Sequence, residues 1–159
     1  EPGALGNEPL IKCWLNTIPD TFKKRKGLPA AIEGCFKKYV PDMLKFMRKN
    51  CKEPVFTVDN NIVQSLMRIL DCYFARYIES EANKVLDTDV EDLEQSIEQL
   101  FVFAMIWSVG CTTDLAGREK FSARLKGILP QKVGMPDAGF VYDYKWDLDK
   151  KEWIIWTMT

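Results

Sequence analysis

The feature that most limits the fold is an unbroken apolar run of eight residues at positions 100–107 (LFVFAMIW). Wound into a helix, this run is hydrophobic on every side, and such a helix is stable only when other elements cover it. It is far shorter than the ~20 residues that cross a bilayer, so we expect no membrane span. The run therefore predicts a buried helix, and a chain of 159 residues is long enough to wrap it.

Amphipathic helices are expected before the run. Apolar residues recur every three or four positions in residues 8–18 and again in residues 29–51, which is the period of a helix with one buried face. Pro19 ends the first of these helices. Pro41 lies in the middle of the second, so we expect either a kink there or two helices that meet.

A third helix follows an extended connector at residues 53–58. Asp59 or Asn60 is the expected N-cap, because short polar side chains accept hydrogen bonds from the first free N–H groups of a helix. The apolar stripe of this helix extends to Tyr77. The next stretch, residues 79–92, is polar and acidic.

The apolar run belongs to a helix that we expect to begin near Leu93 and to stop at Gly110. A shorter amphipathic helix should then cover residues 115–128. Asp114 or Thr113 can cap its N-terminus.

The last part of the chain changes period from 3.6 to two. Residues 153–158 are expected to return as a second strand after a turn at residues 147–151, which together make a β-hairpin. The aromatic residues expected to share one face of the first strand are Phe140, Tyr142, Tyr144 and Trp146. The predicted fold class is thus mainly α, a helical bundle followed by a C-terminal β-hairpin.

The composition argues against many enzyme classes. The chain has no histidine, so the commonest acid–base group and the commonest metal ligand are missing. Its five cysteines are widely spread, which fits reduced thiols in a reducing compartment better than a disulfide scaffold or a metal knuckle. The glycines stand singly, and no phosphate-binding glycine loop occurs. We therefore expect no complete active site, and an enzyme that uses only lysine or carboxylate groups is the least favoured reading.

Charge is unevenly distributed although the net charge is −1. Residues 20–52 hold ten basic and three acidic residues, and residues 79–98 hold eight acidic residues and one lysine. The basic block could bind an acidic partner such as nucleic acid or tubulin. The simpler interpretation, a solvated helix face, is favoured because the block lacks the interleaved exposed aromatics that stack on bases. We expect no nucleic-acid binding.

Several stretches together resemble one family, the dynein heavy chains. They are residues 1–6 (EPGALG), 14–19 (WLNTIP), 46–53 (FMRKNCKE), 61–68 (NIVQSLMR), 101–110 (FVFAMIWSVG), 117–121 (GREKF) and 140–144 (FVYDY) with Trp153 and Trp156. In order, they are similar to the end of the second AAA+ module's large subdomain, to its helical lid and to the hairpin that leads to the third module. The stretch at residues 107–110, with Cys111 and Asp114, is closer to axonemal than to cytoplasmic dyneins.

The resemblance implies a domain division and a role. Residues 1–19 would end the preceding large subdomain, residues 20–130 would form the helical lid, and residues 131–159 would form the hairpin connection to the next module. The chain would be a coupling element of an ATP-driven, minus-end-directed microtubule motor in the axoneme of a cilium or flagellum. Its partners would be neighbouring AAA+ subdomains, and through the parent protein also intermediate chains, light chains and microtubules.

The resemblance also concerns nucleotide contacts. A typical AAA+ lid contributes an arginine that reaches the terminal phosphate, but the position similar to it holds Gln64, and Arg68 follows one turn later. No cofactor is expected within this chain, whereas ATP or ADP would lie in the parent module. Gln64 and Arg68 are the candidate nucleotide-facing residues of a lid that takes little part in hydrolysis.

A second function class stays open on the residues alone. A free-standing helical adaptor could hold a protein partner through its basic surface or its hairpin. It would differ from a motor segment in having its own start and stop codons around these 159 residues.

Overall fold

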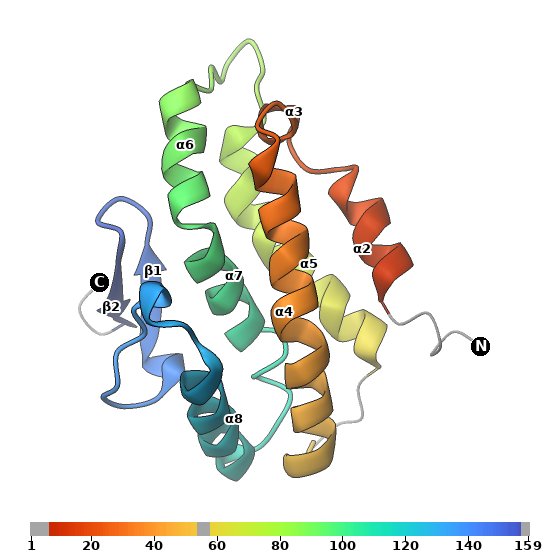
Figure 1. The fold of residues 1–159 in the computed structure, drawn as a ribbon, viewed down its shortest axis with the longest axis vertical. Coiled ribbons are helices and arrows are strands. Elements are labelled where there is room, and N and C mark those ends of the chain that lie inside the picture. Colours follow the sequence, from red (N-terminus) through yellow and green to blue (C-terminus); the bar gives the residue numbers. More distant parts are fainter. Residues whose placement is uncertain (1–6, 54–57, 157–159) are drawn as a thin grey trace.

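The computed structural model describes residues 7–53 and 58–156 as a helical bundle with a two-stranded hairpin against one side (Figure 1). The predicted fold class is confirmed. The helices are α2 (Glu8–Leu15), α3 (Asp20–Lys23), α4 (Gly27–Asn50), α5 (Asp59–Phe74), α6 (Asp87–Gln95), α7 (Ile97–Ile106) and α8 (Leu115–Ile128). Three short 3-10 turns are η1 (Ala75–Tyr77), η2 (Gln131–Val133) and η3 (Val141–Asp143), and the antiparallel strands are β1 (Tyr144–Asp147) and β2 (Glu152–Ile155).

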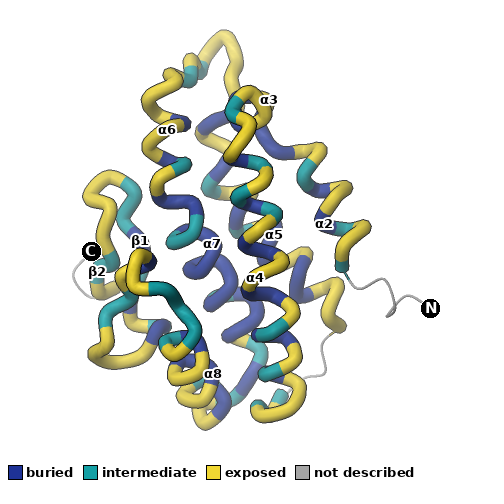
Figure 2. Tube along the Cα trace, in the orientation of Figure 1, coloured by how far each residue is buried: buried dark blue, intermediate teal, exposed yellow. Residues whose placement is uncertain are grey.

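Helix α7 is the centre of the bundle, as the apolar run predicts. Residues 100–106 are at most 6% exposed, and Figure 2 shows the helix as an almost continuous buried segment. Helices α4 and α5 pack against it, and strand β1 covers it from the hairpin side. Trp107, the last residue of the run, is only partly buried.

Helix α2 is shorter than expected and ends at Leu15 rather than Ile18. The Thr17 hydroxyl donates to the Trp14 carbonyl oxygen at 2.6 Å and ends the helix before Pro19 is reached. Trp14 also donates through its indole N–H to Asp71 of α5 at 2.8 Å. This side-chain bond fastens α2 to the bundle.

Helix α4 runs unbroken through Pro41, so the alternative of two helices meeting there is wrong. Proline removes the N–H that would bond the carbonyl of Lys37, which normally destabilises a helix. Here the neighbours Tyr39, Val40 and Met43 are each at most 1% exposed. Packing of this face holds the helix together across the proline.

The N-cap of helix α5 lies one residue before the expected position. Val58 is the N-cap residue and neither Asp59 nor Asn60 caps the helix with its side chain. Asp59 instead accepts hydrogen bonds from Arg48 of α4, at 2.7 Å from Nη2. Of the expected extended connector, residues 54–57 lie outside the described part of the chain.

The acidic stretch contains a helix that the sequence analysis missed. Helix α6 begins at Asp87, not at Leu93, because Asp89 accepts a hydrogen bond from the Leu86 N–H at 3.3 Å while Val90 and Leu93 are buried. Ser96 separates α6 from α7, with φ −107° and ψ 6°. The central helix is therefore two helices that meet at a serine.

The end of α7 and the start of α8 are closely packed. Helix α7 ends at Ile106, before Gly110, and Asp114 caps α8 as predicted by accepting the Gly117 N–H at 2.9 Å. A Cβ atom at Gly110 would lie 2.6 Å from the Ile106 carbonyl oxygen, so the position requires glycine. Thr113 donates to the carbonyl oxygen of Lys52 at 2.6 Å, which joins this corner to the end of α4.

The hairpin begins later than the aromatic pattern predicts. Phe140 is 46% exposed and lies before the turn η3, so it is not on the buried face of the first strand, and Tyr142 lies within that turn. The cause is Asp143, which accepts the Phe140 N–H at 2.8 Å and closes the turn. Tyr144 and Trp146 are buried as expected. Expected strand residues 157–158 lie outside the described part.

Within the described ranges, no helix combines the length and the apolar character that a membrane-crossing segment needs.

Candidate functional site

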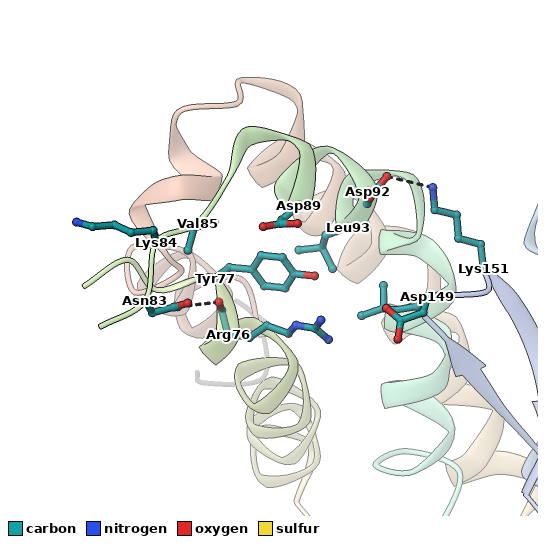
Figure 3. A pocket seen from close by; sticks show the side chains of 11 residues that line it. Arg76, Tyr77, Asn83, Lys84, Val85, Asp89, Asp92, Leu93, Asp149 and Lys151 are labelled. Carbon is teal, nitrogen blue, oxygen red and sulfur yellow. Dashed lines mark hydrogen bonds and ion pairs between the residues drawn. The ribbon is translucent and has the colours of Figure 1, made fainter. Parts of the chain in front are cut away.

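A polar cavity of about 450 Å³ lies where η1, the loop before α6, helix α6 and the hairpin turn come together (Figure 3). We call it the Tyr77 pocket. Its lining is Arg76, Tyr77, Asn83, Lys84, Val85, Asp89, Asp92, Leu93, Leu148, Asp149 and Lys151. Segments distant in the sequence thus combine charged groups with an aromatic ring and aliphatic walls.

Local contacts fix Tyr77 at the base of this pocket. The side chain is 5% exposed and its ring lies 5.5 Å from that of Phe22. The Thr21 hydroxyl donates to the Tyr77 carbonyl oxygen at 2.7 Å. The Asn83 amide donates to the Arg76 carbonyl oxygen at 3.0 Å and folds the loop back over η1. The phenol is therefore held in one orientation, with its hydroxyl towards the cavity (Figure 3).

The pocket mixes both signs of charge. Lys151 is engaged, with its Nζ atom 3.1 Å from Asp92 and 2.8 Å from Gln95. Burial raises the pKa of Tyr77; nearby Arg76 opposes the shift, and the carboxylates of Asp89, Asp149 and Asp92 add to it. The phenol thus stays protonated at neutral pH and can donate or accept a hydrogen bond, but it does not serve as a base.

A second cavity, the α2–α4 groove, has a volume of about 500 Å³ and a more apolar floor. The apolar residues that line it are Ile11, Phe36, Val40, Pro41 and Leu44, and the charged residues are Glu8, Lys12, Glu33, Lys37, Lys45, Arg48 and Asp59. Lys37 lies 3.3 Å from Glu33 and Arg48 lies 2.7 Å from Asp59, so much of this charge is paired.

The two candidate nucleotide-facing residues lie together on α5. Gln64 and Arg68 are both exposed and stand one helical turn apart, and neither lines the Tyr77 pocket or the groove. They offer one amide and one cation, which can contribute a phosphate contact but do not form a complete phosphate site. Arg76 follows Arg68 by eight residues, two further steps of the same i+4 spacing, and lines the Tyr77 pocket. This spacing could have identified Arg76 as a candidate from the sequence.

The basic and acidic blocks face each other in the fold. Arg25 binds Glu94 through two hydrogen bonds of 3.0 and 3.3 Å, and Lys38 lies 3.1 Å from Glu98. Part of the basic block is therefore an internal counterpart of the acidic block. This pairing reduces the charge available for an outside partner.

Glu98 is the most connected acid of the block. Tyr39 donates to its carboxylate at 2.5 Å, and Lys38 and Lys132 lie 3.1 and 3.2 Å away. Burial alone would raise the pKa of Glu98, but these three hydrogen-bonding partners outweigh it and lower the pKa below its ordinary value. The same burial, together with the bond to Glu98, raises the pKa of Tyr39. The network joins α4, α7 and η2.

Catalytic geometry is not evident in the part of the chain that the structure describes. No group of three or more metal-ligating side chains comes together among these residues. All five cysteines are unpaired, and burial raises the pKa of the Cys35 thiol to about 12, which makes it a poor nucleophile.

Comparison with known proteins gives a consistent result. Residues 32–158 match the sequence model of a family described as "Dynein heavy chain AAA lid domain". The chain is 35% identical over 151 residues to "Dynein axonemal heavy chain 1" of Mus musculus, covering 92% of this chain and 4% of that protein. It is 34% identical over 149 residues to the Homo sapiens protein of that name, with 91% and 3% covered. It is 29% identical over 149 residues to "Dynein axonemal heavy chain 2" of Homo sapiens, with 94% and 3% covered. The chain thus spans only a few per cent of these relatives' length.

Proposed function

Because the chain belongs to the family of dynein heavy chain AAA lid domains, we propose that it is the lid of the second AAA+ module of an axonemal dynein heavy chain, with the connection to the third module. In this role it is a mechanical part of a microtubule motor. The observation that carries the proposal is the family match across residues 32–158, which includes both the bundle and the hairpin.

The packing of the bundle supports movement as one body. Helix α4 is tied at its start to α6 by Arg25 and Glu94, and at its end to the α8 corner by Lys52 and Thr113. The hairpin is held by the Trp153 indole N–H, which donates to the Val133 carbonyl oxygen at 2.9 Å. Rigid-body motion of a well-packed unit is a common way to carry a local nucleotide change to a neighbour.

The placement of α2 and the hairpin supports the same role. They lie on opposite sides of the bundle (Figure 1). A lid with this arrangement can connect a preceding large subdomain near α2 to a following module near the hairpin. We propose the corresponding division at residues 1–19, 20–130 and 131–159.

The proposed nucleotide contact is indirect. ATP or ADP would be held by the large subdomain, and Gln64 and Arg68 of α5 would face it from the lid. A neutral amide at position 64 supplies no charge to a terminal phosphate, so the lid would respond to nucleotide rather than drive its hydrolysis. The surrounding heavy chain would supply microtubule binding, intermediate and light chains, and the location in the ciliary axoneme.

Calorimetry with ATP tests the division of labour. We expect the 159-residue chain to release no saturable heat with ATP, because the proposed phosphate-binding residues belong to the large subdomain. Micromolar binding would contradict it. Sequencing the gene around this segment is the complementary check: a phosphate-loop motif roughly one domain length downstream supports the motor, whereas a start codon and a stop codon bordering the segment would favour an adaptor.

A further inference from the structure

We propose that the Tyr77 pocket binds a basic side chain, in the first instance a lysine presented by a neighbouring protein segment. The proposal rests on a cavity, on a hydroxyl that opens onto it and is not used by the fold, and on the sign of the charge that forms no ion pair. It rests on the proposed function only for the source of the segment, which would be an adjacent subdomain of the same heavy chain.

The first observation is the Tyr77 hydroxyl. The residue is 5% exposed. Its hydroxyl makes no hydrogen bond with a described side chain, and it is not among the fully buried polar atoms that lack a partner, so the oxygen itself is open to the cavity. Figure 3 shows it aimed into the cavity. Because the hydroxyl opens onto the cavity and is not used by the fold, a ligand bound there can form a hydrogen bond with it.

The second observation is the balance of unpaired charge. Lys151 forms an ion pair with Asp92. Figure 3 shows the Lys84 side chain extending away from the cavity. Arg76 is then the cation that remains inside, against the carboxylates of Asp89 and Asp149. Neither carboxylate forms an ion pair with a described residue, although one oxygen of Asp89 accepts the Leu86 N–H at 3.3 Å. Two carboxylates without an ion pair outweigh one guanidinium in charge, so the pocket favours a cation.

The surroundings strengthen this preference. Residues 79–98 carry eight acids and one lysine, and two of these acids, Asp89 and Asp92, are exposed and line the pocket. Such a field raises the local concentration of cationic groups.

The third observation is the shape of the walls. Val85, Leu93 and Leu148 supply aliphatic surface beside the carboxylates. A lysine matches this pattern because its four-carbon stem packs on apolar surface while its ammonium donates up to three hydrogen bonds. The acceptors would be the Tyr77 oxygen and the carboxylates of Asp89 and Asp149. The volume of about 450 Å³ leaves room for the backbone that carries the side chain.

The experiment titrates the 159-residue chain with N-acetyl-lysine N-methylamide and follows methyl resonances by NMR. We expect saturable shifts at Val85, Leu93 and Leu148, with little change at the distant core methyls of Leu125, and a dissociation constant on the order of 1 mM for a ligand of this size. The norleucine analogue, which has the same stem without the ammonium, should shift none of them. The glutamate analogue should also fail.

Variants distinguish a specific lysine site from nonspecific attraction to acidic side chains. Tyr77→Phe should weaken lysine binding about fivefold and Asp149→Asn about tenfold. Glu119→Gln, which removes an exposed acid on α8, is the matched control and should leave binding unchanged. Arg76→Gln should tighten binding, because it removes the competing cation, whereas an anionic ligand would be weakened by that change.

Equal shifts with norleucine, preferential binding of the glutamate analogue, or the absence of any saturable shift would each overturn the inference. None of these results depends on the motor role. A lysine site in a chain that proves not to be a dynein lid would therefore leave the inference standing and remove only the proposed source of the segment.

Discussion

At the scale of single residues, two glycines differ in the space around them: one is closely packed and the other faces open space. Gly110 lies where an added Cβ would come within 2.6 Å of both the Ile106 carbonyl oxygen and the Phe121 ring. Gly34 lies in the interior of α4 with nothing within 4 Å of an added Cβ. The same chemical change should therefore have opposite effects at the two positions.

Gly110→Ala should destabilise the chain by about 1–3 kcal/mol, because the α7–α8 corner must open to admit the methyl group. Gly34→Ala should stabilise it by about 0.5–1 kcal/mol, since alanine restricts the unfolded chain and favours the helix. Urea unfolding measures both free energies. Equal effects of the two variants would contradict the packing described for the corner.

Glu98 should make stability depend on pH in acid. Its pKa in the folded chain is lowered from the ordinary value of 4.5, so its contribution is fully present above that value and is lost as the pH falls through the folded pKa. Glu98→Gln should lose stability near neutral pH and show a flatter decline in acid than the parent. Parallel curves for the two proteins below pH 4.5 would rule out this network as the cause.

Cysteine reactivity provides a test of burial. Cys13 and Cys72 are exposed, whereas Cys35 is 7% exposed and its pKa is raised to about 12 by burial. A thiol reagent at neutral pH should modify Cys13 and Cys72 first and reach Cys35 only as the chain unfolds. Mass spectrometry of a labelling time course identifies the order. Early labelling of Cys35 in the folded chain would contradict the placement of α4 against α7.

At the scale of elements, periodicity located most helices because each buries one stripe. Helix α4 was foreseen within two residues at either end. The sequence could not show which local structure forms where two are possible, such as helix or loop, or turn or strand. Asp89 caps a helix inside an acidic stretch, and Asp143 closes a turn where alternation suggested a strand. In both cases one carboxylate bound to a backbone N–H decided the structure.

The site was less predictable than the fold. The Tyr77 pocket is lined by η1, the loop before α6, α6 and the hairpin turn, and only the tertiary structure brings Asp149 and Asp89 to the same cavity. Gln64 and Arg68 came from the family resemblance, and their role stays a prediction. Periodicity placed Tyr77 on a buried stripe but could not indicate that its hydroxyl opens onto a cavity.

Asp114 tests capping at the element scale. Its carboxylate accepts the Gly117 N–H at 2.9 Å, and the same corner holds the end of α4. Asp114→Ala should cost about 1 kcal/mol, whereas Asp114→Asn should be nearly neutral because asparagine also caps well. Thermal or urea unfolding distinguishes them. If asparagine proved as costly as alanine, the charge rather than the cap would be responsible.

At the scale of the whole molecule, charge pairing and a buried central helix make one compact unit. The basic block of α3–α4 and the acidic block of α6–α7 meet through Arg25 with Glu94 and Lys38 with Glu98. Helix α2 and the hairpin lie on opposite sides of that unit (Figure 1). The proposed function is therefore mechanical: the lid would move as a body and would transmit displacement between its neighbours.

Pulsed EPR distances in the intact parent heavy chain test this claim most directly. One spin-label pair spans the lid, at Lys49 of α4 and Glu91 of α6, both exposed, and a second pair joins Lys49 to a site on the following module. Between ATP and ADP states, the account predicts an unchanged distance within the lid and a changed distance from the lid to the module. A distance that changes within the lid while the lid-to-module distance stays fixed would contradict it.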